Sequence, residues 1–289
     1  MQLISSFKEI YNHYDYFIFD IWGVIHDGSK SYDGALETIL FLRQNGKKIC
    51  FLSNAPRRAF KVAEVLEKFG ITKNLYDFIL SSGEATFLDL QKNQQNGFKN
   101  FGQNYFYIGP TKDNDLLEGL DYFKVNEASL ANFAITTGFD NDDSVLEEKL
   151  FQIIDAKKQN LKLICVNPDM VVVKQNGKEI ICAGALALEY QKLGGEVIFY
   201  GKPFFSVYKN VCEIFNHPQN KKILMIGDGM ETDIKGANNF GIDSVLVTGG
   251  ILSKTTKTIY NQLPSSKQLE KIFNQYQLSP NFVISNLKI

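Results

Sequence analysis

Two short apolar runs, far apart in the chain, each lead into an aspartate with a glycine within three residues. Residues 17–19 lead into Asp20, and residues 223–226 lead through Gly227 into Asp228. A short buried strand that presents a carboxylate at its C-terminal end is typical of open parallel α/β sheets, where ligands bind at that edge. Two such strands lying side by side would bring both carboxylates within reach of one divalent cation. The pair therefore predicts a parallel sheet with chemistry at one edge.

The chain alternates between strands and helices, which predicts a doubly wound parallel α/β sheet. Strands are expected at 17–19, 48–51, 78–80, 197–200, 222–226, 244–247 and 282–284, and helices at 35–44, 58–69, 206–216, 231–240 and 267–276. After Leu90 a loop-rich composition begins, and a second group of strands and a helix follows. We therefore expect a core of residues 1–83 and 195–289 with an inserted α/β cap domain at 84–194. Within the cap, Asn176-Gly177 predicts a hairpin turn.

Two more motifs follow expected strands: Ser53-Asn54 after residues 48–51, and Lys202-Pro203 after residues 197–200. With the two aspartate motifs, they stand in the order seen in the haloacid dehalogenase superfamily of phosphohydrolases, which the chain resembles over most of its length. The likeness is greatest to its class IIA branch, which contains sugar-phosphate and nitrophenyl-phosphate phosphatases. Further features of that branch are Gly34-Ala35, Gly46-Lys47, Asn167-Pro168-Asp169 and Gly184-Ala185. The resemblance implies a Rossmann-like core with a C2-type cap.

The resemblance also implies roles for the acidic residues. Asp20 would be the nucleophile that forms an aspartyl-phosphate, and Asp20 and Asp228 would bind Mg²⁺ directly. The main-chain carbonyl of Trp22 would be a third ligand, and Asp233 would orient a metal-bound water. Each aspartate also has a simpler interpretation. Asp20 could be a solvated strand end, Asp228 a turn residue, and Asp233 an acid favoured by a helix dipole.

Ser53, Asn54 and Lys202 are expected to bind phosphate. By resemblance, the Ser53 hydroxyl and the Asn54 main-chain N–H hold the phosphoryl oxygens, although Ser53 is equally typical of a helix N-cap. Lys202, directly after an expected buried strand, would offset charge on the nucleophile and the transferred group, which makes Ser53 and Lys202 candidate catalytic residues. In the cap, Asn167 and Asp169 are candidate substrate-binding residues, although Asn-Pro-Asp is also a common turn.

One position departs from the family pattern. Where the family has a second aspartate, which protonates the leaving oxygen and later activates water, this chain has Trp22. His26 lies in the same loop, and its ordinary pKa of about 6.5 makes it a hypothetical catalytic replacement for that acid. The alternative is a half-buried histidine bonded to main chain. Arg57 and Arg58 are either substrate-facing or ordinary surface residues.

Composition excludes several kinds of partner. A net charge of −1 over 289 residues gives no electrostatic basis for binding nucleic acid or an anionic membrane. The four cysteines lie in apolar stretches without a Cys-x-x-Cys pair, which indicates reduced thiols and favours the cytoplasm. We expect neither a signal peptide nor a membrane-spanning segment. The resemblance allows a homodimer.

Together these motifs and the family that they resemble imply a Mg²⁺-dependent phosphatase for a small, sugar-phosphate-like metabolite, slowed by the absence of an acid at Trp22. One rival is a pseudo-phosphatase that binds phosphometabolites without turnover. The other is a carbon–halogen hydrolase, because dehalogenases of the superfamily also carry an aromatic residue at that position. Asp228 and Asp233 argue against the second rival, since attack on a neutral carbon needs no metal.

Overall fold

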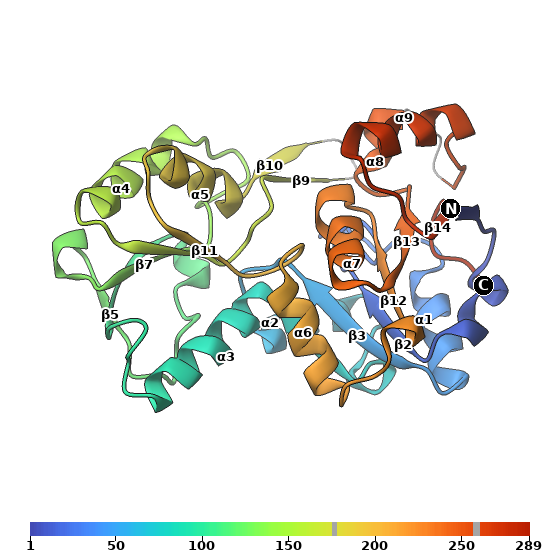
Figure 1. Cartoon of the computed structure of the whole chain (residues 1–289), viewed down its shortest axis with the longest axis horizontal. Coiled ribbons are helices and arrows are strands. Elements are labelled where there is room, and N and C mark those ends of the chain that lie inside the picture. Colours follow the sequence, from blue (N-terminus) through green and yellow to red (C-terminus); the bar gives the residue numbers. More distant parts are fainter. Residues whose placement is uncertain (175–177, 257–260) are drawn as a thin grey trace.

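The computed structural model describes residues 1–174, 178–256 and 261–289. Two parts lie along the long axis of the molecule in Figure 1. The core, which contains both chain ends, is built on a seven-stranded sheet, and the insert is built on a five-stranded sheet. The core sheet is parallel, with helices on both faces, which confirms the expected doubly wound α/β class.

The core sheet has the strand order β1-β14-β13-β12-β2-β3-β4. Its strands are β1 (Gln2–Leu3), β2 (Tyr16–Phe19), β3 (Lys48–Ser53), β4 (Phe78–Ser81), β12 (Ile223–Gly227), β13 (Asp243–Val247) and β14 (Phe282–Ile284). From β2 the chain proceeds to one side through β3 and β4, and after the insert it continues on the other side with β12 and β13. The topological switch point, where open α/β sheets bind ligands, therefore lies between β2 and β12.

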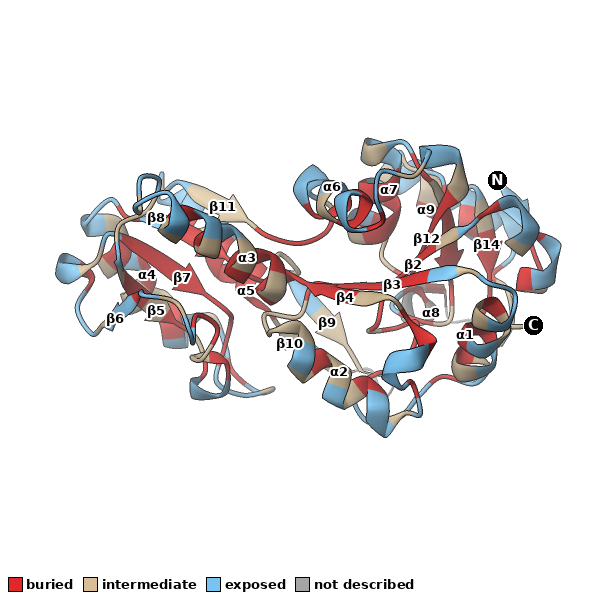
Figure 2. Cartoon of the chain, turned by 90° about the horizontal axis from the view of Figure 1, so that it is seen from below, coloured by how far each residue is buried: buried red, intermediate tan, exposed pale blue. Residues whose placement is uncertain are grey.

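Alternate residues of the core strands pack on opposite faces of the sheet. Phe17 and Phe19 of β2 join a hydrophobic cluster with Ile39 of α1 (Ala35–Gln44). Ile18, between them, joins a second cluster with Val207 of α6 (Phe205–Ile214). This period of two, with both faces buried, is typical of parallel strands between helical layers. Figure 2 shows the core strands as mostly buried ribbons.

The remaining core helices complete these layers. They are α2 (Ala59–Lys68), α7 (Lys235–Phe240), α8 (Leu252–Thr256) and α9 (Ser266–Tyr276). A helix was expected over 231–240, but its first part is a π-helical turn, η7 (Met230–Ile234), which leads into α7. Among the described residues, no helix is both long enough and apolar enough to cross a lipid bilayer. The four cysteines are buried free thiols, as their sequence context predicts.

The insert packs helices on both faces of its own sheet, which has the order β11-β8-β7-β5-β6. Its elements are β5 (Asn104–Ile108), β6 (Phe123–Val125), β7 (Phe133–Thr136), α4 (Glu147–Lys158), β8 (Lys162–Cys165), α5 (Ala183–Lys192) and β11 (Val197–Phe199). Leu186 of α5 and Ile153 of α4 cover one face, and Leu90 of α3 (Ser82–Gln95) lies in a cluster with Phe133 on the other. That second cluster also contains Ile18 of the core, so one hydrophobic cluster joins the two parts.

The position of β11 corrects one expectation. Residues 197–200 were expected to return to the core sheet, but β11 pairs in parallel with β8 at the edge of the insert sheet. After α5 the chain turns at Gly194 and runs directly back beside β8, as a short helical crossover between parallel strands does. An apolar run indicates a strand but not which sheet receives it. The strand Val197–Phe199 therefore belongs to the sheet of the insert. The predicted boundary between the core and the insert at residues 83 and 84 stays a prediction.

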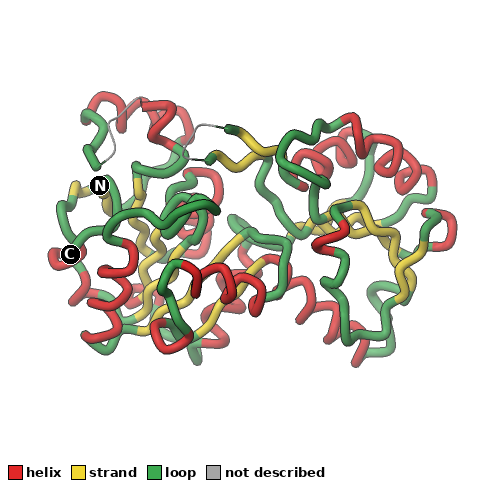
Figure 3. The backbone as a smooth tube through the Cα atoms, turned by 180° about the vertical axis from the view of Figure 1, so that it is seen from behind, coloured by secondary structure: helices red, strands yellow, loops and turns green. Residues whose placement is uncertain are grey.

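A two-stranded hairpin extends from the insert to the core. Its strands, β9 (Val171–Val173) and β10 (Glu179–Ile181), pair antiparallel, with Val173 opposite Glu179. The predicted Asn176-Gly177 turn lies outside the described residues. Figures 1 and 3 show the hairpin extending from the insert towards α8 of the core.

Candidate active site

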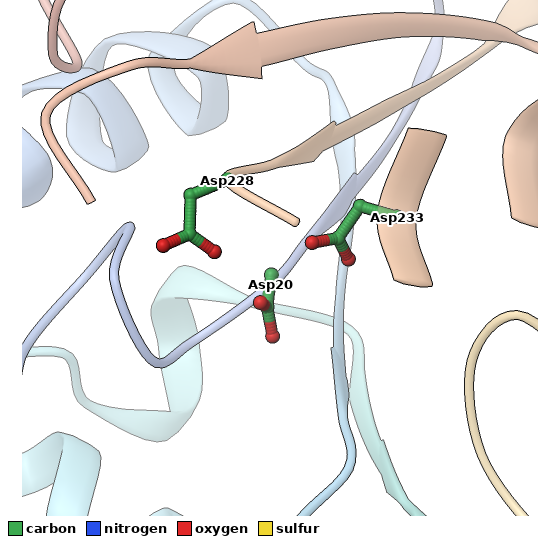
Figure 4. A group of neighbouring side chains, drawn as sticks. All are labelled: Asp20, Asp228 and Asp233. Atoms are coloured by element: carbon green, nitrogen blue, oxygen red, sulfur yellow. The ribbon is translucent and has the colours of Figure 1, made fainter. Parts of the chain in front are cut away.

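Three buried carboxylates converge at the switch point. Asp20 follows β2, Asp228 follows β12, and Asp233 lies in η7. One oxygen from each lies within 4.8 Å of the others, and Figure 4 shows the three carboxyl groups around a common space. Exposed fractions of 8%, 7% and 0% show that water barely reaches Asp20, Asp228 and Asp233. The structure therefore brings together the acidic residues that the sequence singled out.

Two glycines make room for Asp228. A Cβ atom at Gly23 or at Gly250 would lie 2.0 Å from Asp228 Oδ2, which is far inside contact distance. The N–H of Ile251 donates to the same oxygen at 2.7 Å. Gly23 also has φ of 82°, a conformation that favours glycine. The backbone thus encloses this carboxylate so closely that no larger residue fits at either glycine.

Lys202 places its charge among the carboxylates. Its Nζ lies 2.6 Å from Asp20 Oδ1 and 2.8 Å from Asp233 Oδ1, and its side chain is 2% exposed. Burial opposes the charged form, but attraction to Asp20 and Asp233 outweighs it and raises the pKa of Lys202. The residue therefore stays an ammonium and directly neutralises part of the acidic cluster.

One ammonium does not balance three carboxylates. Burial, and then repulsion from Asp233, raise the pKa of Asp20 well above its ordinary value, although Lys202 opposes the rise. The same two causes raise the pKa of Asp228. A site with an uncompensated negative charge and several oxygen donors fits a hard divalent cation. The described residues can therefore hold a metal ion here.

Asn54 links three segments at the edge of this site. Its Oδ1 accepts the N–H of Lys202 at 2.7 Å, and its Nδ2 donates to the carbonyl of Lys202 at 3.1 Å and to Asp169 Oδ1 at 2.8 Å. The side-chain amide is thus occupied, and phosphate binding by the main-chain N–H of Asn54 stays a prediction. Ser53 is not a helix N-cap, because α2 begins at Ala59 with Arg58 as its cap. Its hydroxyl accepts the N–H of Ala55 at 3.2 Å.

The two insert residues proposed to bind substrate form a turn. Asn167 Oδ1 accepts the N–H of Asp169 at 3.0 Å, as in the turn expected for Asn-Pro-Asp. Asp169 then reaches Asn54 of the core, and burial raises the pKa of Asp169 to about 6 although the bond to Asn54 opposes the rise. The turn therefore connects the insert to the core, and substrate binding by these two residues stays a prediction.

Trp22 and His26 lie in the loop after Asp20, and both are engaged by other groups. The indole N–H of Trp22 donates to the carbonyl of Val173 at 2.9 Å. His26 Nδ1 accepts the N–H of Gly28 at 2.9 Å, and its ring stacks on Phe69 with centroids 4.8 Å apart. Burial lowers the pKa of His26 to about 4, even though Asp27 opposes the shift. These contacts favour the structural alternative for His26. The proposed carbonyl ligand at residue 22 stays a prediction.

Several residues of the site were not predicted from the sequence. Gly250 and Ile251 contact Asp228 from the segment that follows β13, and the Gly249-Gly250 pair after an expected strand was the available signal. Arg57 and Arg58, for which the sequence allowed either a substrate-facing or a surface position, form ion pairs. Arg57 lies 2.8 Å from Asp113 of the insert, and Arg58 lies 2.8 Å from Glu84 of α3. Both arginines thus connect the core to the chain that forms the insert.

Relatives of known function resemble the chain over most of its length. The sugar-phosphatase AraL of Bacillus subtilis is 26% identical over 88% of this chain and 92% of its own length. Phosphoglycolate phosphatase 2 of Arabidopsis thaliana is 26% identical over 88% of this chain and 90% of its own length. The 4-nitrophenylphosphatase of Schizosaccharomyces pombe is 25% identical over 90% of this chain and 92% of its own length.

Solved structures and family models agree with these relatives. A haloacid dehalogenase-like hydrolase from Brucella suis superimposes with a TM-score of 0.81 at 28% identity and covers 99% of this chain and 100% of its own. A possible sugar phosphatase from Cytophaga hutchinsonii, 21% identical with a TM-score of 0.80 over 100% of this chain and 99% of its own, shares the fold. One family model, haloacid dehalogenase-like hydrolase, matches residues 17–123, and a second, of like description, matches residues 199–288. The chain therefore belongs to the haloacid dehalogenase-like hydrolases.

Proposed function

We propose that the protein is a Mg²⁺-dependent phosphatase that hydrolyses a small, sugar-phosphate-like metabolite through an aspartyl-phosphate on Asp20. The observation that carries this proposal is the buried group of Asp20, Asp228 and Asp233 with Lys202 between two of them. Phosphatases among the curated relatives support the reaction class. Their named substrates differ, so the identity of the metabolite is the part that experiment must supply.

The residues present can perform the first half of the reaction. A carboxylate oxygen of Asp20 forms a bond to phosphorus while the bond from phosphorus to the ester oxygen breaks, and the leaving oxygen takes its proton from solvent water. Lys202 lies where its ammonium offsets negative charge on Asp20 and on the transferred group. Ser53 and Asn54, at the end of the neighbouring strand, would hold the phosphoryl oxygens. Water then hydrolyses the acyl-phosphate, which releases phosphate and restores Asp20.

The acidic group suits a divalent cation by charge and by donor type. Asp20 and Asp228 would bind Mg²⁺ directly with the carbonyl of Trp22, and Asp233 would act through water. When bound, the ion neutralises charge as an anionic carboxylate approaches an anionic phosphate ester. Lys202 alone cannot do this, because it already compensates Asp20 and Asp233.

Trp22 favours slow turnover or, as the second candidate, binding without turnover. Its single N–H is committed to Val173, so the indole has no proton to offer a leaving oxygen. General acid–base help of this kind contributes roughly 10² to 10⁴ in rate. A carbon–halogen hydrolase is less compatible with the site, because a neutral carbon needs neither a metal nor three carboxylates.

A panel of phosphorylated metabolites, assayed for phosphate release with Mg²⁺ and with chelator, tests the proposal. We expect Mg²⁺-dependent release from at least one sugar phosphate and from nitrophenyl phosphate. Thermal stabilisation by Mg²⁺ plus a phosphate analogue, without release from any ester, would support the binding protein instead. Halide release from a haloacid without metal would contradict both.

A further inference from the structure

Trp22 joins the two parts of the molecule. It is the single tryptophan of the chain, and its indole N–H reaches the carbonyl of Val173 at 2.9 Å. Trp22 belongs to the loop that follows Asp20, whereas Val173 ends strand β9 of the insert hairpin. We propose that Trp22 is a positioning residue that holds the β9–β10 hairpin against the nucleophile loop and thereby sets the affinity for the phosphate ester.

The core side of this contact is rigid. A Cβ atom at Gly28 would lie 2.8 Å from two carbons of the indole, so the loop backbone packs directly on the ring. The ring of His26 meets the indole edge-on at 6.1 Å between centroids, and His26 is itself stacked on Phe69. The direction of the indole N–H is therefore fixed by the core before the hairpin arrives, which lowers the entropy cost of the bond.

The hairpin itself needs contacts with other elements to be stable. The hairpin is a two-stranded ribbon, and such ribbons are marginally stable by themselves. Lys174 contacts Asp142 at 2.6 Å and Lys178 contacts Asp143 at 2.7 Å, but these aspartates are 43% and 86% exposed, so both ion pairs are weak. They also attach the hairpin to the insert, not to the core.

Two hydrogen bonds between the core and this part of the insert bracket β9. Asn54 binds Asp169 just before the strand begins, and Trp22 binds Val173 at its end. The Asn54 bond fixes the base of the hairpin beside the site. The Trp22 bond fixes the part of the hairpin nearer its tip, so it decides how closely the hairpin lies against the loop after Asp20.

The size of the effect follows from the strength of one hydrogen bond. A net contribution of about 0.5–1.5 kcal/mol corresponds to a factor of about 2 to 12 between the held and released hairpin. An ester that binds the held state loses apparent affinity in proportion to the fall in the held fraction when the bond is removed, and this factor is the upper limit of the loss. Because the bound state itself is unchanged, kcat is retained.

A single-atom replacement tests this inference. Growth with 3-benzothienylalanine in place of tryptophan puts sulfur where the indole N–H was, and it alters residue 22 alone because the chain has one tryptophan. We expect backbone amides of β9 and β10 to exchange hydrogen about 2 to 12 times faster in the full-length, metal-free protein, while β7 and β8 exchange as before. KM for nitrophenyl phosphate should rise by up to the same factor, with kcat altered less than about twofold.

A matched control and a second variant complete the design. Tyr107→Phe removes another donor to a main-chain carbonyl in the insert, that of Pro110 at 2.9 Å, and should leave hairpin exchange unchanged. Trp22→Phe, which keeps an aromatic ring without the N–H, should reproduce the effect of the analogue.

Two results would overturn the inference: equal exchange of the β9 and β10 amides with and without the indole N–H, or a loss in kcat at constant KM. Only the kinetic arm rests on the proposed function. If no phosphate ester is turned over, that function fails while hydrogen exchange still decides the role of Trp22.

Discussion

Lys202 Nζ lies 2.6 Å from Asp20 Oδ1, in a buried ion pair that joins the end of β2 to the segment after β11. Neither charge could be buried alone without a large desolvation cost, and each compensates the other. The pair also places a cation against the proposed nucleophile before any substrate binds. Lys202 opposes the rise in the pKa of Asp20 that burial and Asp233 cause.

Asp20→Asn should abolish turnover and leave the fold intact. The amide is nearly the same shape as the carboxylate but cannot attack phosphorus at a useful rate, so kcat for nitrophenyl phosphate should fall by roughly 10³-fold or more. Circular dichroism should show unchanged secondary structure. Turnover near the wild-type rate in this variant would exclude Asp20 as the nucleophile.

Asp228→Asn should weaken Mg²⁺ binding by at least about tenfold, because it removes a charged oxygen ligand from a site that Gly23 and Gly250 shape around it. Isothermal titration calorimetry measures the change. Glu231→Gln is the matched control, since Glu231 is a nearby exposed acid outside the carboxylate group. Equal Mg²⁺ affinity in the Asp228 variant and the wild type would remove Asp228 from the metal site.

Lys202→Met should lower the free energy of unfolding of the metal-free protein by about 3–5 kcal/mol, because it leaves Asp20 and Asp233 buried without their common partner. Mg²⁺ should restore part of this loss. Urea unfolding with and without Mg²⁺ measures both effects. Lys209→Met, at a 64% exposed lysine of α6, should change stability little. A variant as stable as the wild type without metal would show that Lys202 does not compensate the acidic group.

His26→Gln should change stability and its pH dependence, and should leave the pH–rate profile as it is. Burial lowers the pKa of His26 from 6.5 to about 4, so the folded protein favours the neutral ring. The free energy of unfolding of the wild type therefore includes a contribution from the neutral His26 ring. This contribution is fully present above pH 6.5 and is lost as the pH falls towards 4, which amounts to about 3 kcal/mol. Urea unfolding of wild type and variant between pH 4 and 7 should therefore diverge. A fall in kcat in the variant would favour the catalytic hypothesis for this histidine.

The dependence of rate on the leaving group should reveal the missing acid. An alkyl phosphate expels a strongly basic oxygen that needs a proton, whereas an aryl or acyl phosphate does not. We therefore expect kcat/KM to fall steeply as the leaving-group pKa rises, and Trp22→Asp to flatten that dependence. Alkyl and aryl esters that react equally fast in the wild type would show that another residue supplies the proton.

Local patterns predicted most of the core and the convergence of its acidic residues. Short apolar runs predicted the strands, and parallel strands end at one edge, so Asp20 and Asp228 had to approach each other once β2 and β12 were neighbours. The resemblance to the family, through the order of its motifs, was what indicated that β2 and β12 are neighbours. The spacing of the residues alone does not distinguish this strand order from others.

The remaining features depend on contacts between distant segments. The run at 197–199 has the hydrophobic pattern of either sheet, and the short return after α5 decided that β11 pairs with β8. The carbonyl of Val173, which accepts the Trp22 N–H, is a main-chain atom, and any residue type at that position would offer it. A sequence pattern records side chains, so partnerships of this kind leave no trace in it.

The chain crosses between the core and the insert at two points that nearly touch. A Cβ atom at Gly201, after β11, would lie 2.5 Å from Ser82 Oγ at the start of α3, and 2.8 Å from Pro168 of the insert. A segment whose ends meet in this way imposes no stretch on the sheet that it interrupts, whatever its length. The length and internal structure of the insert therefore place no constraint on the register of the core strands, and in the described part of the chain the core reaches the insert through the side chains and loops that line their contact.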